Sequence, residues 1–550
     1  MHAHPSSPAA RAAPTAPTAP ARSPRWRCAL LAAAVALSAT SPLQAQVRLP
    51  ALGESASDDF SLSQEKRVGE QIMREIRPDP DYLDDPVLLD YLRSLWEPLV
   101  KASRTRGDIG VDTAMLFPYE VFLVRDRSVN AFALPGGYVG VHLGLMALTS
   151  TPDELASVLA HELSHVTQRH IARSVAASAR NSTLGLAAML LGILAASRSA
   201  NPDIAQAAIA GGQAAMIQGQ LNFSRDMERE ADRNGFTLMA GAGFASQGMV
   251  GMFDKLDHAN RVNDSGGYPY LRSHPLTVDR IGEARQRVEA VGGSLAAPPA
   301  PLLHGLMQAR ARALMDPSTQ ALHRLQDLDL RAAQAGASLA DKLAALTAAA
   351  LASSQLRDHE RAQRTAQGLS ALVAGLPEGS EPELHRAVNQ LQAELALARS
   401  DAGAAARWLA TDSSDRSRAA LLLRARVALA SNDPVQWRAG SDQLMVWLSD
   451  HRDDALAWLL VSQTSERLGQ TLRAVRAQAE SEAALGNLRG AVDRLRAGQQ
   501  LARSGRVQTD FIELSVIDAR LRDLQGQRRE LLAEQRQARG GRSSGNEPAD

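Results

Sequence analysis

Five consecutive residues carry the clearest chemistry in this sequence: His161-Glu-Leu-Ser-His165. A helix places side chains at i and i+4 on one face, so His161 and His165 can bind one metal ion through two imidazoles. Glu162 lies beside them, where a carboxylate can take a proton from metal-bound water and return it to a leaving amine. The spacing therefore predicts a metal-activated hydrolytic site with Glu162 as general base.

A second, acidic helix is expected to complete this site. A catalytic zinc ion takes three protein ligands and leaves its fourth position to water. Glu228 and Asp232 are four residues apart, so one can ligate while the other hydrogen-bonds a ligand histidine. Glu230 points elsewhere on the helix, toward solvent or a salt bridge. Without the histidine pair, the same acidic run would indicate a solvated helix face.

Three segments, in this order, resemble the metallopeptidase family that includes HtpX and the CAAX prenyl protease: Asn130-Ala-Phe-Ala-Leu-Pro-Gly-Gly137, His161-Glu-Leu-Ser-His165 and Glu228-Arg-Glu-Ala-Asp232. Ser273-His-Pro-Leu276, Arg280 and the helical repeats behind them are similar to the periplasmic, β-barrel assembly-enhancing branch of that family. The resemblance extends from about Ser61 to the end of the repeats.

The resemblance implies one zinc ion per chain, bound by His161, His165 and Glu228. It makes Glu162 the catalytic base and Asp232 a proton-donating or orienting acid. Two histidines and one carboxylate also suit zinc best among divalent ions. The same resemblance implies periplasmic work on outer-membrane β-barrel proteins, namely degradation of stalled or misfolded chains and chaperone-like support of assembly. The outer-membrane assembly machinery is then the partner expected for the repeats.

His274 and Arg280 each have two interpretations. In the branch that the sequence resembles, the position of His274 can approach zinc as a removable fourth ligand, which competes with the attacking water. The alternative is a histidine in a surface loop. Arg280 can stabilise the oxyanion formed when the peptide carbonyl is attacked, or it can be an ordinary salt-bridge residue. Structural roles are expected for four other histidines: His142, His170 (on the same helix as the ligand pair), His258 and His304.

A small sheet is expected just before the metal-binding helix. Tyr119–Arg125 has strand character, and Tyr138–His142 follows it across a turn at Pro135-Gly136-Gly137. The edge at Phe132–Gly137 can bind extended substrate by main-chain pairing, or it can be a plain structural hairpin. Asp153 is expected to cap the helix that carries the histidines.

The N-terminus indicates export. Three arginines, Arg22, Arg25 and Arg27, precede an apolar stretch, which ends in the small-residue exit Leu43-Gln44-Ala45. This pattern predicts a signal peptide cut after Ala45, and no transmembrane span in the mature chain, because the apolar stretch is shorter than a spanning helix needs. An uncleaved membrane anchor is the alternative. Cys28 is the only cysteine and lies within that signal, which excludes disulfides and cysteine-ligated zinc.

Composition predicts a mostly α fold of the α+β class. Aromatic residues make up only 4% of the 550, whereas Ala, Leu, Arg and Gln are plentiful. Basic and acidic residues balance at 60 each, so no global field favours nucleic acid. We expect an HExxH zinc-peptidase domain with a small β-sheet, followed by an all-α, tetratricopeptide-like domain. An unspecialised helical bundle is the alternative for the second part.

The expected boundaries are a signal peptide with disordered leader at 1–45, an N-terminal helical part of the peptidase domain at 46–115, the zinc-peptidase core at 116–295, a proline-rich linker at 296–302, repeats at 303–537 and a disordered tail at 538–550. The apolar segment 183–220 is too short in its densest part to span a bilayer. It is expected either to be a buried helix or hairpin beside the cleft, or to act as a lid that contacts membrane or unfolded chain.

Two rival functions can be weighed from the residues. One is a repeat scaffold or chaperone whose peptidase domain is vestigial or permanently shut by His274. An intact base and three intact ligands argue against it, because a scaffold has no chemical need for Glu162. The other is a membrane-embedded prenyl-peptide protease, which the absence of long apolar segments excludes.

Overall fold

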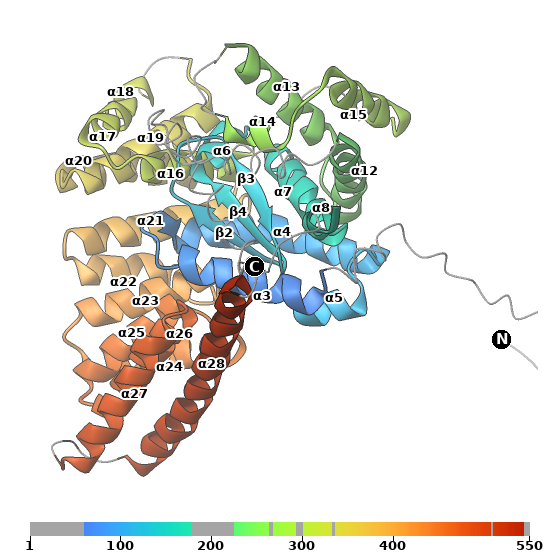
Figure 1. Ribbon diagram of the computed structural model, residues 1–550. Coiled ribbons are helices and arrows are strands. Elements are labelled where there is room, and N and C mark those ends of the chain that lie inside the picture. The colour runs from blue at the N-terminus through green and yellow to red at the C-terminus, as the bar shows by residue number, and fades with distance from the viewer. Residues whose placement is uncertain are drawn as a thin grey trace, which may run out of the picture. The chain divides into compact units, whose positions relative to one another are not determined.

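The computed structural model describes residues 60–177, 225–262, 268–292, 301–332, 336–505, 507 and 510–543. Contacts divide the chain into Met1–Leu52 and Gly53–Asp550, and every described residue belongs to the second unit. The signal peptide predicted at 1–45 and the apolar segment 183–220 lie outside the described residues. The predicted fold, mostly helical with a small sheet, is confirmed (Figure 1). Within these ranges, no helix combines the length and the apolar character that crossing a membrane requires.

The helices that precede the main strands are α3 (Leu62–Ile76), α4 (Pro86–Arg106) and α5 (Val111–Leu116). A capping box begins α3, because the Ser61 hydroxyl accepts from the Gln64 backbone N–H and the Gln64 side chain accepts from the Ser61 N–H. The apolar face of α4 is buried along its length and packs on α7 and α12, the two helices of the candidate site.

The sheet has four strands in the order β1-β2-β4-β3: β1 (Tyr82–Leu83), β2 (Glu120–Val124), β3 (Ala131–Leu134) and β4 (Tyr138–His142). β2 and β4 are parallel, whereas β3 and β4 form an antiparallel hairpin at the sheet edge. The two longer strands were predicted, but their connection was wrong: the turn at Pro135-Gly136-Gly137 joins β4 to β3. Gly136 and Gly137 have φ values of 79° and 90°, which glycine adopts without steric cost.

The helices after the sheet are α6 (Leu143–Leu148), α7 (Pro152–Thr167), α8 (His170–Ala177), α12 (Arg225–Ala242), α13 (Gln247–Val262), α14 (Pro269–Ser273) and α15 (Val278–Ala290). α7 is buried from Glu154 to Val166 and packs against α12, α13, α4 and β3. Its N-cap is Thr151, whose hydroxyl accepts from the Glu154 N–H at 3.2 Å. The predicted cap at Asp153 was wrong: this residue is already helical, and its carboxylate accepts from the Ala245 N–H at 2.8 Å.

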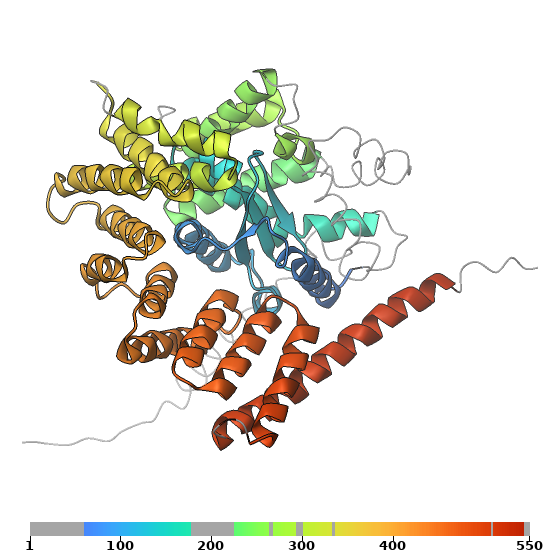
Figure 2. The ribbon, with the colours of Figure 1, turned by 90° about the vertical axis from the view of Figure 1, so that its left-hand side faces the viewer.

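Among the described residues from 301 onward, every regular element is a helix: α16 (Leu302–Met315), α17 (Thr319–Gln326), α18 (Leu328–Ala332), α19 (Leu339–Gln355), α20 (His359–Ala374), α21 (Pro382–Ala398), α22 (Ala402–Ala410), α23 (Arg418–Ala430), α24 (Pro434–Asp450), α25 (Ala455–Arg467), α26 (Thr471–Ala484), α27 (Leu488–Arg503) and α28 (Phe511–Ser543). Consecutive helices stack side by side, as Figure 2 shows for α25, α26 and α27. Buried alanines such as Ala457, Ala477 and Ala491 allow this close approach. α28 extends to Ser543, into the segment 538–550 that was predicted to be a disordered tail.

The helices after residue 301 also contact the first helices of the peptidase domain. α16 packs on α6 and α4, and α23 packs on α4. Arg418 at the start of α23 bridges the two parts, because its guanidinium contacts the carboxylates of Asp84 and Asp454 at 2.5 to 2.8 Å. The N-terminal end of α4 is thus held by residues that lie far along the sequence.

Candidate metal centre

Four potential ligand residues meet in the interior of the described chain. His161 and His165 extend from α7, Glu228 from the facing helix α12, and His274 follows the short helix α14. One ligand atom from each lies within 4.8 Å of the others, and all four side chains are at most 2% exposed. α7, α8 and α12 lie together beside the sheet in Figure 1. The i and i+4 spacing and the predicted acidic helix are therefore brought together in one place.

In this cluster, ring nitrogens of three histidines and the carboxylate oxygens of Glu228 lie close together. His161 Nε2 lies 3.0 Å from His165 Nε2 and 3.3 Å from His274 Nδ1. Glu228 oxygens approach His161 Nε2 and His165 Nε2 at 3.4 Å and His274 Nδ1 at 3.0 Å. Lone pairs that converge in this way fit a cation, which all of them can contact at once.

A pair of residues supports His161 from its other ring nitrogen. His161 Nδ1 lies 2.9 Å from Asp232 Oδ1. Arg280 on α15 holds Asp232 with two hydrogen bonds, from Nε to Oδ2 at 2.6 Å and from Nη2 to Oδ1 at 2.8 Å. Its Nη1 reaches Glu228 at 2.8 Å and donates to the Pro275 carbonyl at 2.8 Å. Each of the three guanidinium nitrogens therefore contacts a neighbouring residue.

The carboxylates around His161 favour a positive charge at this position. Burial would by itself lower the pKa of His161, but hydrogen bonds and negative charge from Asp232 and Glu228 raise it to about 10. Burial would raise the pKa of Asp232, but the charge and hydrogen bonds of Arg280, followed by those of His161, lower it. The cluster holds three buried carboxylates, Glu162, Glu228 and Asp232, and one guanidinium, that of Arg280, which pairs with Glu228 and Asp232. With all three carboxylates ionised, two negative charges are left for a divalent ion to balance.

Glu162 is buried without hydrogen-bond compensation. Its side chain is 0% exposed, and among the described residues neither carboxylate oxygen accepts a hydrogen bond. His274 Nε2 lies 3.5 Å from Glu162 Oε1. A buried carboxylate without donors is costly unless a proton, water or ion meets it. Glu162 therefore has the environment of a group that exchanges a proton with a bound molecule.

His170 also belongs to the centre, although the sequence predicted only a structural role and a place on the same helix as the ligands. α7 ends at Thr167, and a turn at Arg169 precedes α8, which begins at His170. The ring of His170 lies against His165, with 2.8 Å between the two Nδ1 atoms. Spacing in sequence gave no signal for this contact, because it depends on the break between the helices.

Other histidines that were expected to be structural take no part in the cluster. His142 is buried at the end of β4 and lies 2.9 Å from Ser128 Oγ through Nδ1. His304 is buried on α16 between Tyr91 and Thr149. His258 is exposed on α13. The structure thus separates His161, His165, His170 and His274 from the rest.

A buried HExxH helix that faces an acidic helix, with a carboxylate beside the ligand set, is the arrangement of a metal-dependent peptidase. Comparison with known proteins agrees. Residues 105–288 match Peptidase family M48. This range contains β2 to β4, both helices of the cluster, His274 and Arg280.

Several characterised proteins are similar to the chain. It is 29% identical over 483 residues, or 87% of this chain and 93% of the relative, to the β-barrel assembly-enhancing protease of Escherichia coli O157:H7. It is 40% identical over 241 residues to the putative β-barrel assembly-enhancing protease of Vibrio cholerae, an alignment that spans 44% of this chain and 47% of that protein. It is 28% identical over 225 residues, 39% of this chain and 59% of the relative, to a mitochondrial metalloendopeptidase of Saccharomyces cerevisiae.

The chain is therefore a zinc metallopeptidase with a Peptidase family M48 domain, homologous over most of its length to β-barrel assembly-enhancing proteases. The residues that the structure gathers fit the metal of that class, since two histidines and a carboxylate form the usual set of a catalytic zinc site.

Proposed function

We propose that the chain is a zinc endopeptidase of the periplasm that hydrolyses peptide bonds of misfolded or stalled outer-membrane proteins and supports β-barrel assembly. The proposal rests on one observation: His161, His165 and Glu228 come together in the protein interior beside Glu162. The Glu162 carboxylate accepts no hydrogen bond from any described residue. The names of the relatives supply the substrate class, and the sequence pattern at 1–45 supports export with cleavage after Ala45.

In this proposal His161, His165 and Glu228 hold one zinc ion, which when bound supplies a Lewis acid that activates water and the scissile carbonyl. Glu162 accepts the proton of that water and passes it to the leaving amine. Asp232 accepts a hydrogen bond from His161 Nδ1 and fixes the tautomer that offers Nε2 to the metal. Asp232 is therefore an orienting residue rather than a proton donor.

In this proposal Arg280 holds Asp232 in place and does not stabilise the oxyanion. All of its donor nitrogens contact Asp232, Glu228 or the Pro275 carbonyl at 2.6 to 2.8 Å. An oxyanion donor must keep an N–H directed at the position where substrate charge develops. The salt-bridge interpretation of Arg280 therefore agrees better with its contacts.

His274 is proposed to regulate access to the metal as a removable fourth ligand. It lies within the ligand cluster and is 2% exposed, which does not fit a histidine in a surface loop. Pro275, the next residue, is tied through its carbonyl to Arg280. Displacement of His274 would open the position that water needs.

The edge strand β3 is proposed to bind substrate in extended form. Within the part of the chain that the structure describes, β3 pairs with β4 on one side only, and it packs against α7, which carries the catalytic residues. A free strand edge offers main-chain donors and acceptors, which recognise a chain without regard to its side chains. Such recognition suits an enzyme that acts on varied misfolded proteins.

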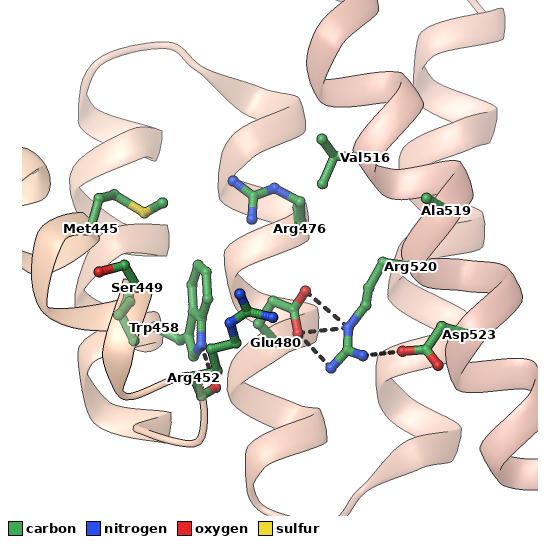
Figure 3. Close-up of a pocket in the computed structure, with 11 residues that line it drawn as sticks. Met445, Ser449, Arg452, Trp458, Arg476, Glu480, Val516, Ala519, Arg520 and Asp523 are labelled. Atoms are coloured by element: carbon green, nitrogen blue, oxygen red, sulfur yellow. Dashed lines mark hydrogen bonds and ion pairs between the residues drawn. The ribbon is translucent and has the colours of Figure 1, made fainter. Parts of the chain in front are cut away.

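The helices after residue 301 are proposed to form the tetratricopeptide-like domain that holds substrate or assembly machinery. A cavity of about 590 Å³ lies between α24, α25, α26 and α28 (Figure 3). Trp458 lines it, and the Arg476 guanidinium lies 5.6 Å from the Trp458 ring centroid. Met445, Leu448 and Val516 add apolar surface, and Val516 is 40% exposed. An apolar side chain of a bound protein segment fits this surface.

The cavity is tested by Trp458→Ala in the full mature chain. Binding of an unfolded outer-membrane β-barrel protein, measured by fluorescence anisotropy, is expected to weaken several-fold while the zinc content stays the same. Unchanged binding would show that the cavity does not serve this purpose.

The enzymatic proposal is tested by metal content and casein cleavage of wild type, Glu162→Gln and His274→Ala. We expect about one zinc per chain, loss of cleavage in Glu162→Gln with zinc retained, and faster cleavage in His274→Ala. Cleavage that survives Glu162→Gln, or a chain that binds no zinc, would leave the rival scaffold function as the better account. Chaperone-like binding alone should survive Glu162→Gln.

A further inference from the structure

The second ligand histidine, His165, has its own line of supporting residues, distinct from the pair that supports His161. His170 Nδ1 lies 2.8 Å from His165 Nδ1. The other ring nitrogen of His170, Nε2, lies 3.1 Å from Glu230 Oε2. The same Glu230 oxygen accepts from Arg173 Nη1 at 2.9 Å. The line therefore runs from α7 to α8, across to α12, and back to α8.

The contacts in this line determine which ring nitrogen of His165 and of His170 carries a proton. If His165 offers the Nε2 lone pair to a metal, its Nδ1 carries the proton and must donate. His170 Nδ1 is then the acceptor, which leaves the His170 proton on Nε2. That N–H points at Glu230, which is ionised and already paired with Arg173. The arrangement is consistent only when His165 Nε2 faces the metal.

The backbone is strained at the point that brings His170 to His165. Arg169, between α7 and α8, has a φ of 51°, in the left-handed region that is unfavourable for a residue with a side chain. Two contacts hold it there: Arg169 Nε donates to Glu65 Oε2 at 3.0 Å, and Nη2 donates to the Phe60 carbonyl at 2.6 Å. Glu65 is only 2% exposed. A continued helix would carry His170 away from this position.

We propose that His170, held by Glu230 and Arg173, is a positioning residue that fixes the tautomer and ring orientation of the zinc ligand His165. The inference rests on the proposed zinc site. It assigns the two ligand histidines different supports, a carboxylate for His161 and a neutral imidazole for His165. A carboxylate partner makes its histidine a stronger electron donor than a neutral partner does. Because the partner of His165 is neutral, the net charge of Glu162, Glu228, Asp232 and Arg280 stays at two negative charges, which a divalent zinc ion balances.

The test compares His170→Leu with His170→Asn in the full mature chain. Leu fills the space but offers no acceptor, whereas the Asn carbonyl can take the place of Nδ1. Zinc affinity, measured by competition with a chromophoric chelator, is expected to fall about 10- to 100-fold in His170→Leu and to recover largely in His170→Asn. The visible spectrum of the cobalt-substituted protein should shift in the Leu variant and return toward wild type in the Asn variant.

His304→Leu is the matched control, because it also removes a buried, hydrogen-bonded histidine but lies on α16, outside the cluster. Its apo-protein melting temperature should fall at least as far as that of His170→Leu, with zinc affinity unchanged. Two results would overturn the positioning role. Zinc affinity could be unchanged in His170→Leu, or it could fall by the same factor in His170→Leu, His170→Asn and His304→Leu. A wild-type chain that binds no zinc would instead overturn the proposed function.

Discussion

Arg280 and Asp232 form a two-point ion pair at 2.6 and 2.8 Å in a place where their side chains are only 4% and 11% exposed. Asp232 in turn contacts His161 Nδ1 at 2.9 Å. The pair thus connects α15 and α12 to a metal ligand on α7, and a change at Arg280 should be felt at the metal.

Arg280→Lys is expected to weaken zinc binding about 10-fold or more, because an ammonium cannot make the planar two-point contact with Asp232. The dissociation constant for zinc, by chelator competition, is the deciding measurement. If Arg280 served the oxyanion instead, zinc affinity would be unchanged and only kcat would fall. Arg285→Lys, whose pair with Asp254 is half exposed, is the matched control and should change neither quantity.

Gly235 sets how closely α12 approaches α7. A Cβ at this position would lie 3.2 Å from the backbone nitrogen of His161 and 3.3 Å from the carbonyl carbon of Ala160. Both distances are shorter than most Cβ contacts in proteins. Gly235→Ala should therefore push α12 outward and displace Glu228 and Asp232. We expect several-fold weaker zinc binding, with little net change in stability, because alanine gains about 1 kcal/mol of helix propensity.

Gly305→Ala on α16 is the control for this change, since nothing lies within 4 Å of a Cβ there. It should raise the unfolding free energy slightly and leave zinc affinity alone. Equal zinc affinities in the two alanine variants would show that the close approach at Gly235 does not position the ligands.

The sequence predicted the parts of the site that depend on local spacing. His161 and His165 share a helix face, and Glu228 and Asp232 share another, so helical geometry alone placed each pair. Glu230 was expected in solvent or a salt bridge, and its 2.9 Å contact with Arg173 is such a bridge. That the two helices meet was expected from the number of ligands that a catalytic zinc ion needs.

His170 and β3 show why the remainder escaped prediction. The helical pattern runs through residue 170, so it conceals the left-handed Arg169 that ends α7 early and turns His170 back. β3 has only four residues, and its pairing with β4 depends on tertiary packing. This pairing leaves β2 and β4 as parallel neighbours. Both features depend on packing against distant residues, such as Glu65 with Arg169, which local propensity does not report.

His304 should make the protein sensitive to acid. Burial lowers the pKa of His304 to about 4, and its Nε2–H donates to the Thr149 carbonyl at 3.0 Å while Nδ1 accepts from the Tyr91 hydroxyl at 2.6 Å. The unfolded chain binds a proton near pH 6.5 and the folded chain near pH 4. Stability from this group is therefore full above pH 6.5 and is lost as pH falls toward 4, by about 3 kcal/mol.

The measurement is urea unfolding of wild type and His304→Gln at several pH values between 4 and 7. The wild type should lose more unfolding free energy over this window than the variant. The difference between their slopes of free energy against pH should approach the value for one proton per chain. Parallel pH profiles would contradict the assignment. Stability decreases as the pH falls because the unfolded state binds more protons than the folded state throughout the window.

Arg310 is expected to be the most sensitive residue where the repeats meet the peptidase domain. It is 5% exposed, and its guanidinium contacts both Asp85 oxygens at 2.7 and 2.8 Å and both Glu394 oxygens at 2.8 and 2.9 Å. Arg310→Met strands two carboxylates, so we expect a loss of about 3 to 5 kcal/mol of unfolding free energy.

A second variant separates charge from packing at this interface. Adding Asp85→Asn and Glu394→Gln to Arg310→Met removes the stranded charges, and Asn at 85 still caps α4, where Asp85 accepts from the Leu88 N–H at 2.9 Å. The triple variant should recover much of the lost stability in urea unfolding. Arg386→Met, with a side chain 39% exposed beside Asp412, should cost under about 1 kcal/mol. If Arg310→Met were as mild as Arg386→Met, the buried ion pairs of Arg310 with Asp85 and Glu394 would not be what joins α16 to α4 and α21.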